Sequence, residues 1–211
     1  MNGFSWNRFE TAPLVAILRG FPDELIPRIV EGVVRGGFVN LEITLNTPNA
    51  EAQIRRAVDV AAGRLHVGAG TVLDLDGLDR AVGAGASFIV TPSTNAAVVG
   101  ACVRRGIPVV PGALTPTEIH AAWERGARWV KVFPADRLGP AFIRQVKEIL
   151  PAIRLMPTGG VGMGSLAAYR EAGASGCGIG SPLFEGVDLE GDDGTALSAR
   201  CRELLRAWRA G

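Results

Sequence analysis

The sequence predicts an α/β protein that forms a single (β/α)8 barrel over residues 1–211, with a short helix before the first strand. Apolar, β-branched runs alternate with helix-like segments at a spacing of about 20 to 25 residues, which is typical of βα units around a parallel sheet. Glycine repeatedly follows the helix-like segments just before the next strand, where it can end a helix in a left-handed cap. No linker rich in proline or serine interrupts this pattern, so we expect one domain.

Eight apolar runs are predicted as strands. Short continuous apolar runs suit strands that are buried on both faces, as strands in a parallel sheet are. The runs are Leu14–Leu18, Phe38–Thr44, Leu65–Thr71, Phe88–Pro92, Ile107–Pro111, Trp129–Phe133, Arg154–Pro157 and Ser175–Gly180.

Helices are expected between these strands and at both ends of the chain. Asp23–Gly36, for example, carries apolar residues at a spacing of three to four, which indicates an amphipathic helix. The segment Asn2–Glu10 is expected to form a short helix across the bottom of the barrel. Thr195–Trp208 is expected to form a terminal amphipathic helix.

Composition narrows the possible function. The formal net charge is +1, so no excess of either sign points to nucleic acid or to a membrane surface. The chain has no signal-peptide pattern and no apolar stretch long enough to span a membrane, and its three cysteines are widely spaced. His66 and His120 stand apart from other metal-binding residue types. We therefore expect a soluble, cytoplasmic protein without a metal site.

Polar residues at the ends of the predicted strands are the candidate site, because a (β/α)8 barrel carries its active site at the carboxyl ends of its strands. The carboxyl ends of the strands should bring together side chains that are far apart in the sequence. The candidates are Arg19, Glu42, Thr44, Asn46, Thr71, Lys131, Phe133 and Thr158.

Lys131 is one of two lysines in the chain, and it lies inside the apolar run Trp129–Phe133. Burial favours a neutral amine, which is a nucleophile. The simpler alternative is a lysine whose ammonium reaches water from a strand end. Strand alternation directs Lys131, Glu42 and Thr44 into the barrel. Burying two opposite charges costs desolvation free energy that a structural ion pair repays poorly. A catalytic role for the two residues is therefore favoured over a structural buried ion pair.

Two glycine-rich loops follow the last two strands. Gly159 and Gly160 lie in one of them, and Gly180 and Ser181 lie in the other. Backbone N–H groups without side chains beside them can bind an anion, and phosphate sites in barrels of this kind commonly lie in these two loops. The sequence therefore predicts a phosphate site there.

Several strings at the strand ends closely resemble the 2-keto-3-deoxy-6-phosphogluconate and 2-keto-3-deoxy-6-phosphogalactonate aldolases. The resemblance runs in order from about Pro13 to Phe184. The strings are VAILRG at 15–20, LEITLNTP at 41–48, VGAGTV at 67–72, VTP at 90–92, VFPA at 132–135 and PTGGV at 157–161.

This resemblance implies a class I aldolase, usually a homotrimer, that needs no cofactor. It implies cleavage of a phosphorylated keto-deoxy sugar acid to pyruvate and D-glyceraldehyde 3-phosphate. Lys131 corresponds to the Schiff-base lysine, and Glu42 to the acid/base that moves protons through a bound water. The expected substrate contacts are Arg19, Thr44, Asn46, Thr71, Phe133 and Thr158, and the expected phosphate contacts are Gly159, Gly160, Gly180 and Ser181.

Asn46 bears on which sugar acid is the substrate. The gluconate enzymes commonly carry arginine where this chain has Asn46, and the string LNTP resembles the galactonate branch. Asparagine cannot make the bidentate carboxylate contact of arginine, so Arg19 is expected to bind the carboxylate. The sequence thus favours galactonate, with a gluconate or dual-specificity enzyme as the alternative.

Two readings from outside this family stay open at this point. One is another phosphate-binding barrel, such as a ribulose-phosphate epimerase-like or thiamine-phosphate-synthase-like enzyme. Such enzymes would need paired aspartates or metal ligands at the strand ends, which the sequence lacks. The other is a non-catalytic sugar-phosphate sensor, which would have little use for an interior lysine and glutamate.

Overall fold

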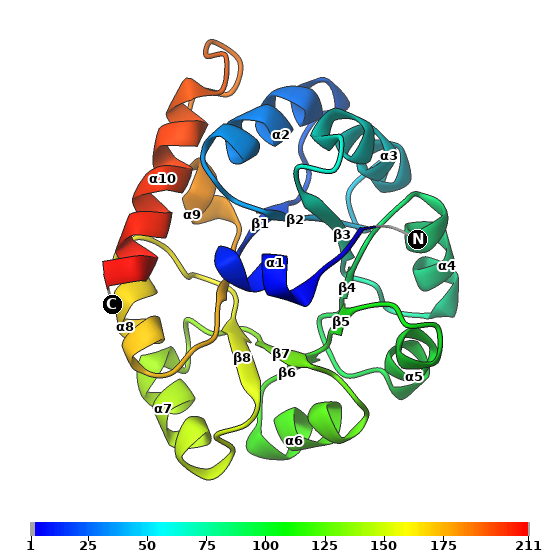
Figure 1. Ribbon diagram of the computed structural model, residues 1–211, viewed down its shortest axis with the longest axis vertical. Coiled ribbons are helices and arrows are strands. Elements are labelled where there is room, and N and C mark those ends of the chain that lie inside the picture. The colour runs from blue at the N-terminus through cyan, green and yellow to red at the C-terminus, as the bar shows by residue number, and fades with distance from the viewer. Residues whose placement is uncertain (1–2, 211) are drawn as a thin grey trace.

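A computed structural model describes residues 3–210, and it confirms an α/β fold with a parallel sheet (Figure 1). All of the strand pairs in this part of the chain are parallel. The strands are β1 (Leu14–Leu18), β2 (Asn40–Thr44), β3 (His66–Gly70), β4 (Ile89–Val90), β5 (Val109–Val110), β6 (Gly112–Ala113), β7 (Trp129–Val132), β8 (Arg154–Pro157) and β9 (Cys177–Ile179).

Helices surround the strands in Figure 1, and most of them connect one strand to the next, while α1 precedes the first strand and α9 and α10 follow the last. None of the helices in residues 3–210 is both long and apolar enough to span a membrane. The helices are α1 (Trp6–Thr11), the 3-10 turn η1 (Asp23–Leu25), α2 (Ile26–Arg35), α3 (Ala50–Ala61), α4 (Leu75–Gly83), α5 (Ala96–Arg104), α6 (Pro116–Glu124), α7 (Gly139–Ile149), α8 (Leu166–Glu171), α9 (Ser181–Phe184) and α10 (Thr195–Ala210).

The described strands form two hydrogen-bonded sheets rather than one. The larger has the order β5-β4-β3-β2-β1-β9, and the smaller has the order β6-β7-β8. The strand expected at Ile107–Pro111 ends early, and its continuation pairs with the second sheet as β6. Pro111 lies at this break, and proline has no N–H to continue a ladder. A parallel bridge between Thr158 and Gly178 connects β8 to β9 across the other boundary.

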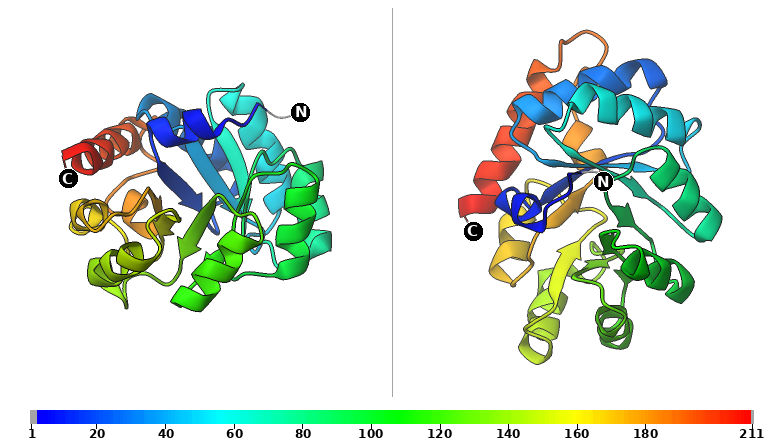
Figure 2. Two further views of the ribbon diagram at one scale, coloured as in Figure 1. Left: turned by 60° about the horizontal axis from the view of Figure 1, so that its bottom comes forward. Right: turned by 45° about the vertical axis from the view of Figure 1, so that its right-hand side comes forward.

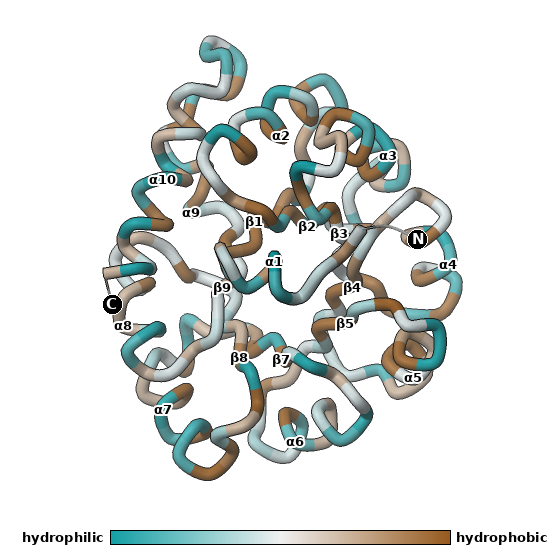
Figure 3. The backbone as a smooth tube through the Cα atoms, viewed as in Figure 1, coloured by the Kyte–Doolittle hydropathy of each residue, from teal (hydrophilic) through white to brown (hydrophobic). Residues whose placement is uncertain are grey.

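The curled sheet has an inner and an outer apolar layer. The outer cluster includes Leu41 and Ile43 of β2 with the inward faces of the helices, and Val130 and Val132 of β7 belong to it as well. Residues of opposite parity therefore face the interior, as the alternation in the sequence predicted. Figure 3 shows the hydrophobic residues gathered on the strands and on helix faces toward them, with hydrophilic ones outside.

The interior is filled by aromatic residues at the end where the strands begin. Phe9 of α1 packs there against Phe88 and Trp129, with ring centroids 5.8 and 5.2 Å away. The two views of Figure 2 show α1 lying across this end. The expected helix at Asn2–Glu10 thus exists, but it begins after Ser5, whose side chain accepts a hydrogen bond from the Arg8 N–H as an N-cap. Asn2 lies outside the described residues.

Candidate active site

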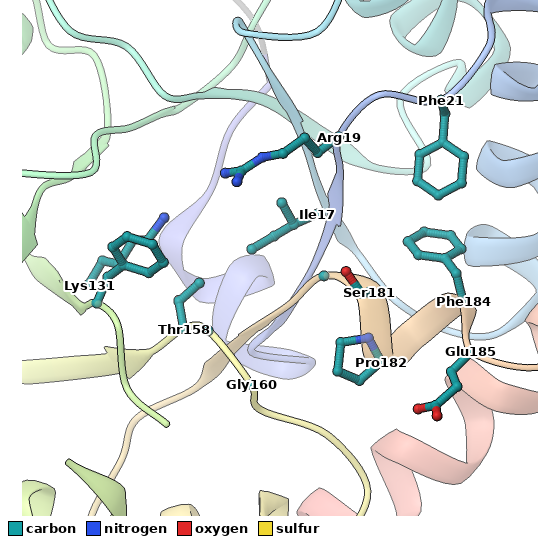
Figure 4. Close-up of a pocket in the computed structure, with 13 residues that line it drawn as sticks. Ile17, Arg19, Phe21, Lys131, Thr158, Gly160, Ser181, Pro182, Phe184 and Glu185 are labelled. Atoms are coloured by element: carbon teal, nitrogen blue, oxygen red, sulfur yellow. The ribbon is translucent and has the colours of Figure 1, made fainter. Parts of the chain in front are cut away.

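A cavity of about 700 Å³ opens where β1, β7, β8 and β9 end. Figure 4 shows side chains from these strand ends and from the loops after them. Because four separate strands contribute, residues far apart in sequence share one wall. The lining residues are Ile17, Arg19, Phe21, Lys131, Phe133, Thr158, Gly159, Gly160, Gly180, Ser181, Pro182, Phe184 and Glu185.

Lys131 lies in β7 and is 5% exposed. Its Nζ lies 4.9 Å from the centroid of the Phe133 ring, and it makes no hydrogen bond or ion pair with any residue from 3 to 210. Burial lowers the pKa of this amine; the charge of Glu42 opposes the change, and that of Arg19 adds to it. A lysine without a partner, with its neutral form favoured, can attack a carbonyl carbon in the cavity.

Glu42 in β2 is 1% exposed, and within the described chain neither carboxylate oxygen has a hydrogen-bond partner. Burial raises the pKa of this carboxyl group, although the positive charges of Lys131 and Arg19 act in the opposite direction. A buried carboxyl group without partners is costly in a protein interior. A carboxyl group whose pKa is raised holds its proton more readily and can release it to a base in the cavity, which is the property of a general acid or base.

Gly70 of β3 provides the space for this carboxylate. A Cβ atom at position 70 would lie 1.7 Å from Glu42 Oε1, far inside van der Waals contact. Strands β2 and β3 pair in register, with Thr44 opposite Gly70. The glycine in the string VGAGTV therefore has a local physical role, which is to let Glu42 fold over the neighbouring strand.

Arg19 follows β1 directly and is exposed to the cavity. In Figure 4 its guanidinium extends toward Lys131, with Thr158 nearby. No hydrogen bond or ion pair of this side chain is present in residues 3–210. Arg19 and Lys131 are the basic residues that line the cavity and Glu185 is the acidic one, and the two basic residues suit the part of the cavity beside Lys131 to an anionic group.

The two predicted glycine loops meet at one side of the cavity. Gly159 and Gly160 both have left-handed backbones, with φ of 97° and 68°, which glycine adopts without strain. Gly180 and Ser181 stand at the start of α9. The Thr158–Gly178 bridge holds the bases of the loops together. All four predicted phosphate residues, with Thr158, therefore line one cavity.

Three predicted substrate residues lie outside the cavity lining. Thr44 is buried, and its hydroxyl oxygen is 3.3 Å from the Leu18 carbonyl oxygen. Asn46 is exposed in the turn after β2. Thr71 has a left-handed backbone with φ of 56°, an unusual conformation for a β-branched residue and one that is common at functional sites.

Several residues that line the cavity were not predicted from the sequence. Phe21 and Phe184 face each other with ring centroids 4.6 Å apart, and Figure 4 shows them at the end of the cavity away from Lys131. Both lie outside the strands, where no periodic pattern marks them. Ile17 was within reach of the prediction, because alternation in β1 gives it the parity of Arg19.

Comparisons with known proteins agree with this geometry. The sequence profile described as "Aldolase: KDPG and KHG aldolase" matches residues 6–199. The 2-dehydro-3-deoxy-6-phosphogalactonate aldolase of Escherichia coli (strain K12) is 40% identical over 92% of this chain and 97% of its own. The 2-dehydro-3-deoxy-phosphogluconate aldolase of Treponema pallidum (strain Nichols) is 35% identical over 77% of this chain and 76% of its own. A solved structure described as "Native KDPGal structure" superposes with a TM-score of 0.86 at 36% identity and covers 94% of this chain and 95% of the other.

Proposed function

Because the chain belongs to the KDPG and KHG aldolase family, we propose that it cleaves 2-dehydro-3-deoxy-6-phosphogalactonate through an imine on Lys131. The family makes the protein an aldolase, a carbon–carbon lyase. The observation that carries the rest is Lys131 itself, which is buried, without a partner and in contact with a cavity. Glu42, also without a partner, lies close enough to influence its pKa.

The reaction begins when the neutral amine of Lys131 attacks the C2 carbonyl carbon of the substrate. Loss of water gives an iminium, which accepts the electron pair of the C3–C4 bond as that bond breaks. Glu42 removes the proton of the C4 hydroxyl, and D-glyceraldehyde 3-phosphate leaves. Glu42 then returns a proton to C3 of the enamine. Water hydrolyses the resulting pyruvate imine and restores the amine.

In this proposal, the residues that line the cavity beside Lys131 bind the substrate. Arg19 binds its carboxylate, and Thr158 and Phe133 pack around the pyruvate part. The phosphate lies against the backbone of Gly159, Gly160, Gly180 and Ser181. Binding energy at the phosphate, remote from C2, orients the bond that breaks. Thr44, Asn46 and Thr71 remain predicted substrate contacts, although they do not line the cavity.

The preference for galactonate rests on Asn46 and on the name of the Escherichia coli relative. The alternative is a gluconate or dual-specificity enzyme, favoured by the match to the Treponema pallidum enzyme. The two substrates differ in configuration at C4. A coupled lactate dehydrogenase assay with both substrates tests the proposal: we expect pyruvate from both and the larger kcat/KM with the galactonate compound. Equal values would remove the preference, and no pyruvate from either would overturn the aldolase assignment of this site.

We also propose that the two sheets close into one (β/α)8 barrel. The Thr158–Gly178 bridge supports closure at one boundary. At the other, the Lys131 N–H donates a hydrogen bond of 2.8 Å to the Pro111 carbonyl, in the segment between β5 and β6. The resemblance to the aldolase family leads us to propose a homotrimer, and the composition of the chain leads us to propose a cytoplasmic location. Light scattering should then give three times the mass of the 22.1 kDa chain.

A further inference from the structure

We propose that Thr47 is a positioning residue, which acts through Thr44 to fix the direction in which Arg19 enters the cavity. The inference rests on the proposed function, because it assigns Arg19 to an anionic group of the substrate. Thr47 is 5% exposed and does not line the cavity, so it has no direct route to a ligand.

The guanidinium of Arg19 has no support from other side chains in residues 3–210. Its direction therefore depends on the backbone of residues 18–20. This backbone leaves β1 at Leu18 and turns at once, because Gly20 has a left-handed φ of 72°. A long, flexible side chain on an unrestrained turn would lose much conformational entropy on binding a ligand. A restraint on the turn lowers that loss.

Two buried hydroxyl groups provide the restraint. The Gly20 N–H donates to Thr47 Oγ1 at 3.0 Å, and Thr47 Oγ1 lies 3.2 Å from Thr44 Oγ1. Thr44 in turn donates to the Leu18 carbonyl at 3.3 Å. Because that carbonyl can only accept, the Thr44 hydrogen is used there, and the Thr47 hydroxyl must donate to Thr44. The result is a closed chain of hydrogen bonds in one direction around Arg19.

The chain anchors Arg19 to the strand that carries Glu42. Thr44 is the last residue of β2, two positions after Glu42, and it is completely buried. Thr47 is fixed in the turn after β2, where its N–H donates to the Thr44 carbonyl at 2.9 Å. Arg19 and Glu42 are thus held relative to each other although one follows β1 and the other lies in β2. Loss of the Thr47 hydroxyl would let the exposed Gly20 N–H turn to water and release the turn.

The first test is Thr47→Val, which keeps the shape of the side chain and removes the hydroxyl. We expect KM for the phosphorylated keto acid to rise about tenfold while kcat changes less than about twofold, since a lost binding restraint affects ground state and transition state alike. Thr47→Ser should restore wild-type KM. The matched control is Ser198→Ala, which removes a buried hydroxyl from α10. If Thr47→Val does not fold, Thr47→Ala removes the same hydroxyl and should raise KM equally.

A double-mutant cycle with Arg19→Met separates positioning from general destabilisation. If Thr47 acts through Arg19, Thr47→Val should add no further increase in KM once Arg19 is replaced. A tenfold increase in both backgrounds would overturn the inference, as would an unchanged KM in Thr47→Val.

Amide hydrogen exchange reads the restraint without any catalysis. The peptide that contains Gly20 should exchange faster in Thr47→Val than in the wild type, and faster than in Ser198→Ala. Equal exchange would overturn the inference whatever the activity. A wild-type protein that releases no pyruvate would instead overturn the proposed function, so the two failures can be told apart.

Discussion

The two ends of the sheet interior differ in how their polar groups are satisfied. At the end where the strands begin, Asn40 donates to the carbonyls of Phe9 and Ala12 and contacts His66 Nδ1 at 3.0 Å, while His66 Nε2 accepts from the Ser5 N–H. Among the described residues at this end, Trp129 Nε1 is a buried donor without a hydrogen-bond partner. At the other end, the side chains of Lys131 and Glu42 have no hydrogen-bond or ion-pair partner among residues 3–210. The free groups therefore mark the end that binds a ligand.

A single strand shows the same contrast. Trp129 and Lys131 are two residues apart in β7 and share its interior face. Trp129 packs against Phe9 and against Trp6, with centroids 5.2 and 6.3 Å away. Lys131 faces the cavity instead. The aromatic end closes the interior to water from below, and this keeps the environment of Lys131 apolar enough to favour its neutral amine.

The largest expected effect comes from the free end. Lys131→Met should reduce kcat by about four orders of magnitude or more, because no imine can form. The thermal unfolding midpoint should stay near that of the wild type, since the Lys131 side chain makes no hydrogen bond or ion pair within residues 3–210. Lys147→Met is the matched control, because its Nζ donates to the carbonyls of Pro151 and Ile153 instead. Substantial turnover by Lys131→Met would contradict the assignment of catalysis to the end of the sheet that carries Lys131.

Glu42→Gln should have the next largest effect. Loss of a general acid or base typically lowers the rate by about 10² to 10⁴-fold. The amide keeps the size of the side chain beside Gly70, so the fold should persist. Pyruvate should still form a reducible imine with this variant while turnover stays low. Unchanged kcat would show that the proton is moved by another group.

At the aromatic end, Phe9→Ala should act on stability rather than on chemistry. Phe9 is completely buried, and its removal should cost about 3–5 kcal/mol in the free energy of unfolding. Urea unfolding measures the loss, and assays at low temperature measure kcat in the folded fraction, which should change little. A large fall in kcat without a loss of stability would mean that the two ends are not separate in function.

The smallest effect concerns His66, whose pKa is lowered to about 4 from 6.5 by burial, with a further contribution from Arg8. The unfolded chain binds a proton between these values and the folded chain does not, so stability should be constant above pH 6.5 and fall as the pH is lowered toward about 4. His66→Gln should remove most of this slope in urea unfolding. An equal slope in the wild type and in His66→Gln would contradict the role of His66.

Strand alternation in the sequence predicted the interior faces of β2 and β7, because a period of two is fixed by the backbone alone. The positions of the glycines predicted the two loops after the last strands, because a glycine backbone can turn there without a partner from elsewhere in the chain. The break at Pro111 was missed, since it depends on which neighbour the strand pairs with. The hydrogen bond from the Thr44 hydroxyl to the Leu18 carbonyl was also missed, because it depends on the register between two strands. The role of Thr44 as a substrate contact stays a prediction. The pair of Phe21 and Phe184 likewise joins the loop after β1 to the end of α9, which no local pattern connects.

The central claim is that the unpaired lysine of the free end forms an imine with pyruvate. Borohydride reduction in the presence of pyruvate, followed by peptide mass spectrometry, tests this claim most directly. We predict one added reduced pyruvate per chain, located on Lys131 and absent from Lys131→Met. Labelling on Lys147, or no labelling of the wild-type protein, would contradict the account.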